Sequence, residues 1–311
     1  MLLTFKNFTV SLFLLTALLL VLANVSPATA APAKNAQKSF FSPDEALKGL
    51  IQAVRDNNTK ELLAILGPGS KEIISSGDPV DDKAGRERFI KLHDEKIVIE
   101  GAETGKAIFS MGNEDYPFPI PVVKKGTVWR FDAKAGREEL LNRRIGRNEL
   151  EVIEVLRAYV DAQREYASTD WDGDGALAFA QKFRSSPGKK DGLYWAAKEG
   201  EKQSPFGPFA AKAAKEGYSK ENAALHGYFF RILKGQGKDA EGGAFDYLVN
   251  DKMLLGFALV AYPAQYGSSG IMTFIVNHNG VVYQKNLGKT SGTIAAAMKL
   301  YNPDKSWKKV E

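Results

Sequence analysis

The sequence predicts an α+β protein built from two units, one in each half of the chain. In the first half, three segments with helical periodicity are followed by a series of short strand-like runs. In the second half, an amphipathic helix over about residues 149–168 is followed, after an irregular stretch, by four more strand-like runs. Helices and antiparallel strands that are separated along the sequence are typical of α+β folds. With 311 residues, 44% of them hydrophobic and 25% charged, the chain has a soluble globular composition and is long enough for two ordinary domains.

The first 30 residues have the layout of a secretory signal peptide. Lys6 precedes a long apolar run, which ends at Pro27 and the A-x-A cleavage site Ala28-Thr29-Ala30. An uncleaved membrane anchor is the alternative interpretation, because the apolar run is long for a signal. We expect cleavage, a flexible lead over residues 31–40, and a mature protein in the periplasm or outside the cell. No later apolar run reaches the ~18 residues of a membrane span, so no span is expected after signal cleavage.

The sequence contains no cysteine, which excludes disulfides, thiol catalysis and the cysteine-linked anchor of a bacterial lipoprotein. Its three histidines, His93, His226 and His278, form no H-E-x-x-H motif, so zinc catalysis is excluded as well. Loss of the signal removes only Lys6 among the 42 basic and 37 acidic residues, which leaves a net charge of +4. That weak bias is spread along the chain and does not favour a nucleic-acid partner.

The first unit is expected to occupy residues 41–142. Its first helix has a complete start signal, with Ser42 as N-cap, Pro43 at the first position and Glu45 as the partner in a capping box. Apolar residues of this helix recur at helical spacing, at Ala46, Leu50, Ile51 and Val54. The other expected elements are helices within 59–70 and 82–96, and strands within 96–101, 106–112, 117–126 and 127–134. A hairpin turn is expected at Lys125-Gly126.

The second unit is expected to occupy residues 143–311. Gly146 is expected to divide the helical pattern into two helices, of which the second, about 149–168, has the stronger periodicity. Strands are expected within 227–237, 256–267, 271–280 and 281–288, and a short helix within 291–301. Asn279-Gly280 is expected to be the tip of a hairpin.

Many motifs occur in a fixed order between residues 40 and 310, among them ILGPGS, SSGDPV, PFPIPVVK, LNRRIGRNEL, YVDAQREYA, HGYFFRIL, GGAFDYLVN, GFALVAYPAQYG and MTFIVNHNGVVYQK. Together they resemble one bacterial family of exported proteins, domain-of-unknown-function family 2950. The resemblance implies no activity and supplies no catalytic residues.

Two coarser resemblances concern the fold. The order of elements in residues 41–142 resembles the cystatin-like cone fold, with helices on a curved sheet. Residues 143–311 resemble pilin-like and pseudopilin head domains, in which a long helix lies on an antiparallel sheet. The residues that match the closing hairpin of those domains are Pro263, Gly267, Gly270, Thr273, Phe274 and Gly280. In a pilin the helix follows an apolar N-terminal anchor, whereas here another unit precedes it.

The stretch DWDGDG contains three alternating aspartates that could hold calcium. Asp170, Asp172 and Asp174 occupy positions 1, 3 and 5 of a calcium loop, and Gly175 occupies the turn position. Position 12 is Gln181 instead of a bidentate glutamate, which would weaken binding. The alternative is an Asp/Gly-rich turn that caps a following helix within 176–183. Apart from this possible calcium, no cofactor is expected.

Other motifs fail on spacing. LGKTSG lacks the first glycine of a phosphate loop, and GSSGI lacks the last glycine of a nucleophile elbow. A serine hydrolase would need Ser268 or Ser269 with His226 or His278 as base. The carboxylate pairs Glu114-Asp115 and Asp161/Glu165 are more typical of solvated surfaces than of acid–base catalysis.

Residues 142–149, NRRIGRNE, place three arginines at the expected boundary between the units. Arg143, Arg144 and Arg147 either bridge the two halves or form an anion pocket. Without a catalytic constellation, we expect a non-catalytic envelope protein that binds or assembles with another protein or a surface component. The alternative is a periplasmic hydrolase or small-ligand-binding protein that uses a pocket in the first unit. Candidate lining residues for that pocket are Tyr116, Trp129 and Arg130.

Overall fold

The computed structural model describes residues 37–198, 200–218 and 223–311. The expected signal peptide and most of the expected flexible lead therefore lie outside the described residues. The end of that lead is held in place, because Phe40 is 3% exposed and exchanges two backbone hydrogen bonds with Trp129. No helix in the described ranges is sufficiently long and apolar to cross a membrane.

The described residues contain two hydrophobic clusters in one compact unit, Gln37–Glu311. The first cluster draws its buried residues from Phe40 to Ala133, and the second from Val152 to Tyr301. Helices and antiparallel sheets occur in both parts, so the expected α+β class is confirmed. The expected boundary between residues 142 and 143 falls inside one helix, and the division into two domains stays a prediction.

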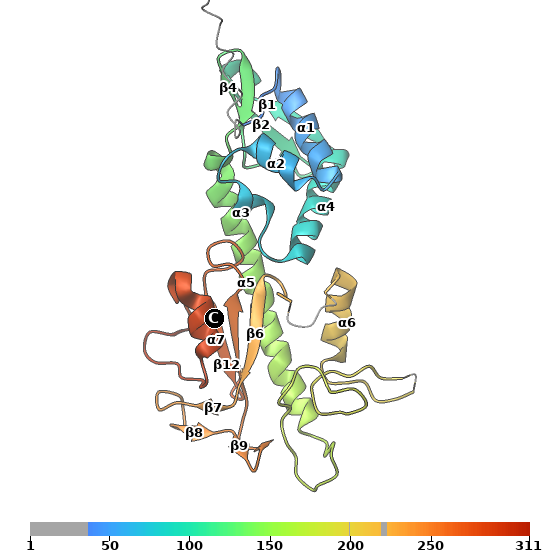
Figure 1. The fold of residues 1–311 in the computed structure, drawn as a ribbon, viewed down its shortest axis with the longest axis vertical. Helices are drawn as coiled ribbons and strands as arrows, with labels where there is room; N and C mark the ends of the chain where they lie inside the picture. The colour runs from blue at the N-terminus through green and yellow to red at the C-terminus, as the bar shows by residue number, and fades with distance from the viewer. Residues whose placement is uncertain (1–36, 199, 219–222) are drawn as a thin grey trace, which may run out of the picture. The chain divides into compact units, whose positions relative to one another are not determined.

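The first cluster lies between helices and a five-stranded antiparallel sheet (Figure 1). The sheet has the order β1-β2-β4-β5, and β3 pairs with β2. The strands are β1 (Ile97–Glu100), β2 (Lys106–Met111), β3 (Tyr116–Pro117), β4 (Val122–Lys125) and β5 (Val128–Phe131), with a 3-10 turn η1 (Ala102–Thr104) after β1. The helices are α1 (Pro43–Arg55), α2 (Thr59–Leu66), α3 (Lys71–Ile74) and α4 (Pro79–Glu95). The expected hairpin is confirmed, because Lys125 pairs with Val128 across Gly126, which has a φ of +64°.

The start of α1 follows from its sequence. The side chain of Ser42 accepts a hydrogen bond from the backbone N–H of Glu45. The carboxylate of Glu45 reaches back to the N–H of Phe41, one residue before the N-cap. All four residues of the expected apolar face are buried in the first cluster.

Helix α4 is anchored at its start by a buried carboxylate. One oxygen of Asp78 accepts hydrogen bonds from the amides of Val80 and Asp81, which caps the helix. The other oxygen accepts from the Tyr218 hydroxyl at 2.9 Å and the Gly227 amide at 2.8 Å. Asp78 is 0% exposed, and its hydrogen bonds to Tyr218 and Gly227 tie the start of α4 to the later part of the chain.

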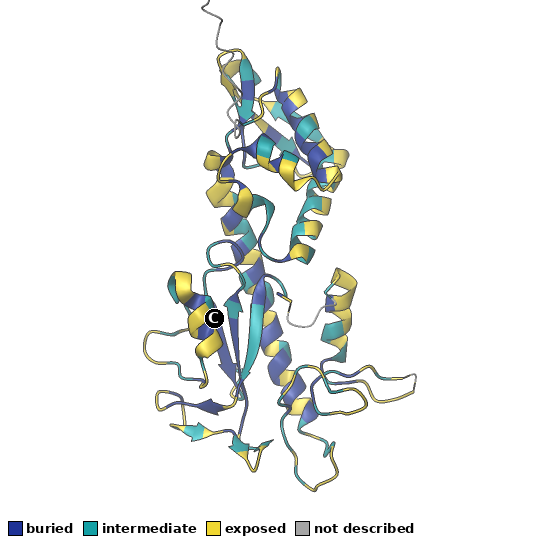
Figure 2. Cartoon of the chain, viewed as in Figure 1, coloured by how far each residue is buried: buried dark blue, intermediate teal, exposed yellow. Residues whose placement is uncertain are grey.

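Helix α5 (Ala133–Tyr166) is one continuous helix of 34 residues. The expectation that Gly146 divides it is therefore wrong. Leu141, Ile145 and Asn148 are buried on both sides of this glycine, so packing holds the helix together where local propensity is weakest. Ala133 belongs to the first cluster and Val152 to the second, which makes α5 the element shared by both cores (Figure 2).

The second cluster lies between α5 and an antiparallel sheet of order β14-β13-β12-β11-β6. Its strands are β6 (Tyr228–Leu233), β11 (Ala258–Pro263), β12 (Thr273–Asn277), β13 (Tyr283–Lys285) and β14 (Lys308–Lys309). The remaining elements are α6 (Gly207–Glu216), the pair β7 (Gly235–Gln236) and β8 (Phe245–Asp246), the pair β9 (Leu248–Val249) and β10 (Lys252–Met253), η2 (Gly288–Thr290) and α7 (Ser291–Ala297). Helix α5 packs on β11 and β12, so the expected arrangement of a long helix on an antiparallel sheet is confirmed.

No helix follows the aspartate loop, contrary to the expectation for residues 176–183. The amide of Phe179 instead donates to the carbonyl of Met253 at 2.8 Å and forms an isolated bridge to β10. Phe179 also stacks edge-on against Phe257, with ring centroids 4.8 Å apart. These contacts with a distant part of the chain override the local helical pattern.

Candidate ligand-binding site

A cavity of about 410 Å³ lies within the first part of the chain. Its walls come from helices α1 to α4, from β3 and the segment that follows it, and from the first half of α5. The volume falls within the range of about 300–1,000 Å³ that is typical of small-molecule sites.

Most of the cavity wall is apolar. The apolar lining residues are Leu50, Val54, Leu62, Leu66, Ile73, Ile74, Phe89, Leu92, Phe118, Pro119, Ile120 and Leu140. Those from α1 and α2 are buried in the first cluster, whereas Phe89 and Leu92 of α4 are only half-buried. None of the 17 residues of α4 is buried, although Phe89, Ile90 and Leu92 pack against the edge of the first cluster, so this helix covers the cavity from the periphery of the core.

The charged lining residues come from two helices only. Helix α4 contributes Asp81, Asp82, Arg86 and Arg88, and α5 contributes Arg143, Arg144 and Arg147. Five guanidinium groups therefore meet two carboxylates at one part of the wall. This arrangement attracts a group of negative charge.

Asp81 is the carboxylate that links the two helices across the cavity. Its side chain is 12% exposed and lies 3.5 Å from the guanidinium of Arg88 and 3.3 Å from that of Arg147. Asp82 is bound differently, because its carboxylate accepts the amide of Ser76 at 2.9 Å. Both carboxylates are therefore already engaged.

Arg144 is held by backbone carbonyls. Its guanidinium donates to the carbonyls of Glu72 at 2.7 Å and Ile73 at 2.6 Å, and it also lies 3.4 Å from the hydroxyl of Ser268. Burial lowers the pKa of Arg144 below its usual value, while the nearby carboxylates of Asp82 and Asp81 oppose that change. Arg144 thus joins α3, α5 and the segment before β12.

Arg143 and Arg86 differ in their partners. Arg143 donates to the Tyr116 hydroxyl, covers the Tyr116 ring at 4.7 Å from its centroid, and pairs with Glu139 at 2.5 Å. Arg86, which lines the cavity from α4, makes no hydrogen bond or ion pair with any residue that the structure describes. Arg86 is therefore the lining cation that a ligand can engage without breaking an existing contact.

Part of this site is predictable from the sequence. Arg143, Arg144 and Arg147 come together as in the anion-pocket alternative, and Arg144 also bridges as in the other alternative. Tyr116 lines the cavity, whereas Trp129, which is buried, and Arg130 are not among its lining residues.

The contribution of α4 to the cavity is not expected from its charged residues alone. The mixture of acidic and basic residues within 81–88 is typical of a solvated helix face. The signal that could have identified them is the apolar pair Phe89 and Leu92 directly after this charged run, on a helix with no other apolar stripe.

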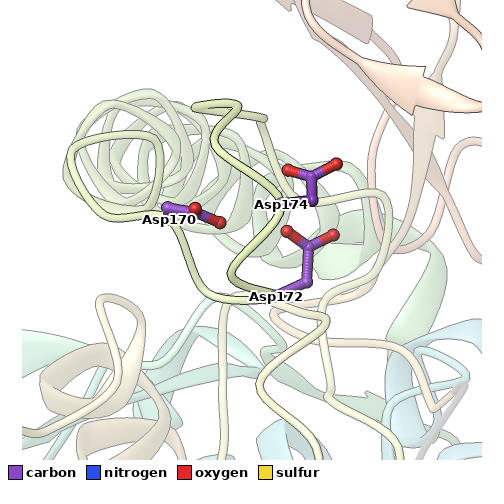
Figure 3. A group of neighbouring side chains, drawn as sticks. All are labelled: Asp170, Asp172 and Asp174. Atoms are coloured by element: carbon purple, nitrogen blue, oxygen red, sulfur yellow. The ribbon is translucent and has the colours of Figure 1, made fainter.

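The three aspartates of the loop lie together, with one carboxylate oxygen of each within 4.8 Å of the others (Figure 3). Asp170 accepts the amides of Gly173 and Gly175, each at 2.8 Å, as in an Asp/Gly-rich turn. The Nζ of Lys252 lies 2.9 Å from Asp172 and also pairs with Asp174. This hydrogen bond from Lys252 lowers the pKa of the Asp172 carboxyl.

Gln181, at position 12 of the calcium-loop pattern, is engaged elsewhere: it donates to the carbonyl of Asp251 at 2.6 Å and accepts from Lys234 at 2.9 Å. No helix follows the loop. The expectation that the Asp/Gly-rich turn caps a helix within 176–183 is therefore wrong. Calcium binding at this loop would require the cation to displace Lys252 from Asp172 and Asp174.

The residues of the hydrolase alternative are not arranged for catalysis. The hydroxyl of Ser269 accepts the amide of Gln265 at 2.9 Å, and no serine hydroxyl bonds a histidine ring among the described residues. His226 lies 3.6 Å from Glu216, and burial lowers the pKa of His278. The carboxylate pairs are on the surface, where Asp115 pairs with Lys96 and Asp161 with Arg164.

The segment 262–270, YPAQYGSSG, is partly buried, most of all at its end. Ser268 and Ser269 are 3% and 0% exposed. Asn148 of α5 donates to the carbonyl of Ser269 at 2.9 Å, and Arg144 contacts the hydroxyl of Ser268. The segment is therefore used for internal packing against α5.

The fold and cavity define an α+β protein with two antiparallel sheets, a helix shared by two cores and an arginine-rich apolar pocket. Residues 37–310 match the family model described as "Protein of unknown function (DUF2950)", and the chain belongs to that family. Comparisons with the curated proteins and with the solved structures found no match.

Proposed function

We propose that this chain is a non-catalytic binding protein that holds a small, mainly apolar ligand in the cavity between α1, α2, α4 and α5. The observation that carries the proposal is the cavity itself. It has a volume of about 410 Å³, a mainly apolar wall, and charged lining residues that come from two helices only. A concave apolar site with a few convergent polar groups is the usual form of a small-ligand site.

The same observations favour the small-ligand alternative over the assembly module. Assembly through the segment 262–270 is disfavoured because its two serines are buried and the carbonyl of Ser269 is bound by Asn148 of α5. A hydrolase is disfavoured because its candidate residues bind other partners.

Export to the periplasm or beyond is also part of the proposal. Its support is the signal-like pattern of residues 1–30, with Lys6, the apolar run and the A-x-A site. The likeness of the first part to a cystatin-like cone is supported by helices on an antiparallel sheet. The likeness of the second part to a pilin head is supported by the packing of α5 on β11 and β12.

The proposal can be tested with a neutral fluorescent ligand, 1-aminoanthracene, and two tryptophan variants of α5. Leu140 lines the cavity, so Leu140→Trp should occupy it and abolish saturable dye binding. Leu150 is on the same helix, outside the cavity and 68% exposed, so Leu150→Trp should bind the dye like the wild type.

Melting temperatures and circular dichroism establish that both variants are folded. Equal dye binding by all three proteins, or no saturable binding by the wild type, would refute the proposed function.

A further inference from the structure

We infer that the ligand of this cavity is a single-chain anionic amphiphile, whose apolar chain lies along the wall of α1 and α2 and whose anionic head lies at Arg86. This inference rests on the proposed function and specifies the chemistry of the ligand.

The first support is the uneven distribution of polarity around the cavity. Every lining residue from α1, α2 and α3 is apolar, as are residues 118–120. Every charged lining residue lies within residues 81–88 of α4 or 143–147 of α5. A ligand that satisfies both regions needs an apolar body and one polar end.

The second support is the balance of charge at that polar end. Asp81 is shared between Arg88 and Arg147, and Arg143 pairs with Glu139. The remaining two lining arginines have no carboxylate within ion-pair distance, because Arg144 is bound to carbonyls and Arg86 has no partner among the described residues. One anionic head at Arg86 would complete this arrangement, since arginine binds carboxylate and phosphate groups with two parallel hydrogen bonds.

The third support is the incomplete cover of α4. Phe89 and Leu92 face the cavity but are only half-buried, although they belong to the periphery of the first cluster. An apolar chain in the cavity would remove more of their surface from water, which is favourable in proportion to the area buried. The ligand would therefore fasten α4 to the core.

The cavity volume is consistent with a single alkyl chain. A volume of about 410 Å³ is typical of small-molecule sites. Dodecanoate has a single alkyl chain together with a carboxylate head. Dodecanol has the same chain and a neutral head, so the two compounds form a matched pair of probes.

The experiment is a calorimetric titration of the full chain with dodecanoate below its micelle concentration and with dodecanol below its solubility limit. We expect dodecanoate to bind about tenfold to a hundredfold more tightly than dodecanol, as hydrogen bonds to charged groups allow. Arg86→Gln should weaken dodecanoate binding about tenfold and leave dodecanol binding unchanged.

The control is Lys83→Gln on the same helix. Lys83 has a side chain that is 75% exposed and does not line the cavity, so its removal should change neither affinity. The melting temperature of each variant in the absence of ligand shows whether the fold is retained.

The outcomes separate the two proposals. Equal affinity for dodecanoate and dodecanol would overturn the anionic head while the proposed function stands. Unchanged dodecanoate binding by Arg86→Gln would overturn the position of the head. If neither amphiphile binds and 1-aminoanthracene does, the amphiphile is wrong and the cavity binds another apolar compound. If none of the three binds, the proposed function itself fails.

Discussion

Two glycines of α5 have opposite surroundings, and replacing each with alanine should change stability in opposite directions. A Cβ atom on Gly136 would lie 2.4 Å from the carbonyl oxygen of Pro119 and 2.8 Å from the Cα of Ile120. A Cβ atom on Gly146 would meet nothing within 4 Å. Both glycines are inside the same helix, so the gain in helix propensity is similar for the two changes.

The magnitudes follow from this geometry. Gly146→Ala should stabilise the protein by about 0.5–1 kcal/mol, because alanine loses less conformational entropy in a helix. Gly136→Ala has the same gain, but the backbone at Pro119 and Ile120 must move, and overpacking of this kind costs about 1–3 kcal/mol. We expect a net destabilisation of about 1–2 kcal/mol for Gly136→Ala.

The assay is thermal unfolding by calorimetry. A change of 1 kcal/mol corresponds to a shift in Tm of about 2–4 °C in a chain of this size class. Gly146→Ala should raise Tm by about 1–4 °C, and Gly136→Ala should lower it by about 2–8 °C. A decrease in Tm for Gly146→Ala would refute the continuity of α5, because a glycine that ends a helix loses stability when replaced by alanine. No decrease for Gly136→Ala would refute the close contact with Pro119.

Three further predictions concern carboxylates. Asp78→Ala leaves four buried or capping donors without an acceptor and should lower the free energy of unfolding in urea by about 3 kcal/mol or more. The control is Asp161→Ala at an exposed position, which should change stability by no more than ~0.5 kcal/mol. Similar losses for the two variants would contradict the role of Asp78. The hydrogen bond from Lys182 lowers the pKa of Asp191 to about 2. The stabilisation by Asp191 is therefore full above its ordinary pKa of 3.8 and is lost as pH falls towards 2. The difference in Tm between the wild type and Asp191→Asn should vanish over that range, and a constant difference would contradict the lowered pKa. Excess calcium, compared with a chelator, should leave Tm unchanged, because Lys252 already supplies positive charge between two of the loop aspartates; a rise in Tm would show that calcium binds in place of this contact.

Local signals predicted the parts of the fold that depend on neighbouring residues. The N-cap of α1 and the β4–β5 hairpin are set by side chains and glycine conformations within a few residues, so the sequence contains their causes. Gly146 does not end the helix because its local cost of about 1 kcal/mol is outweighed by burial of Ile145 and Asn148. The missing helix after the aspartate loop has a similar cause, because Phe179 pairs with Met253, more than 70 positions away.

Only part of the candidate site can be predicted from the sequence, because the rest depends on contacts between distant residues. Arg143, Arg144 and Arg147 are close in sequence and form an obvious cluster. Asp81 and Arg86 join them only because α4 lies next to α5 in the fold, and the charged residues of α4 do not by themselves indicate which helix they face. A charged helix face above a cavity has the same periodicity as one that faces water.

The buried carboxylate of Asp78 gives the cavity a connection to a remote part of the chain. It holds the first turn of α4 and, at the same time, the phenol of Tyr218. A bound molecule that contacts α4 stabilises the folded first turn of this helix. Because such coupling is reciprocal, a change that stabilises the turn also raises the affinity for the bound molecule. Tyr218 is therefore a position at which retention of the guest molecule can be tuned without any contact with it.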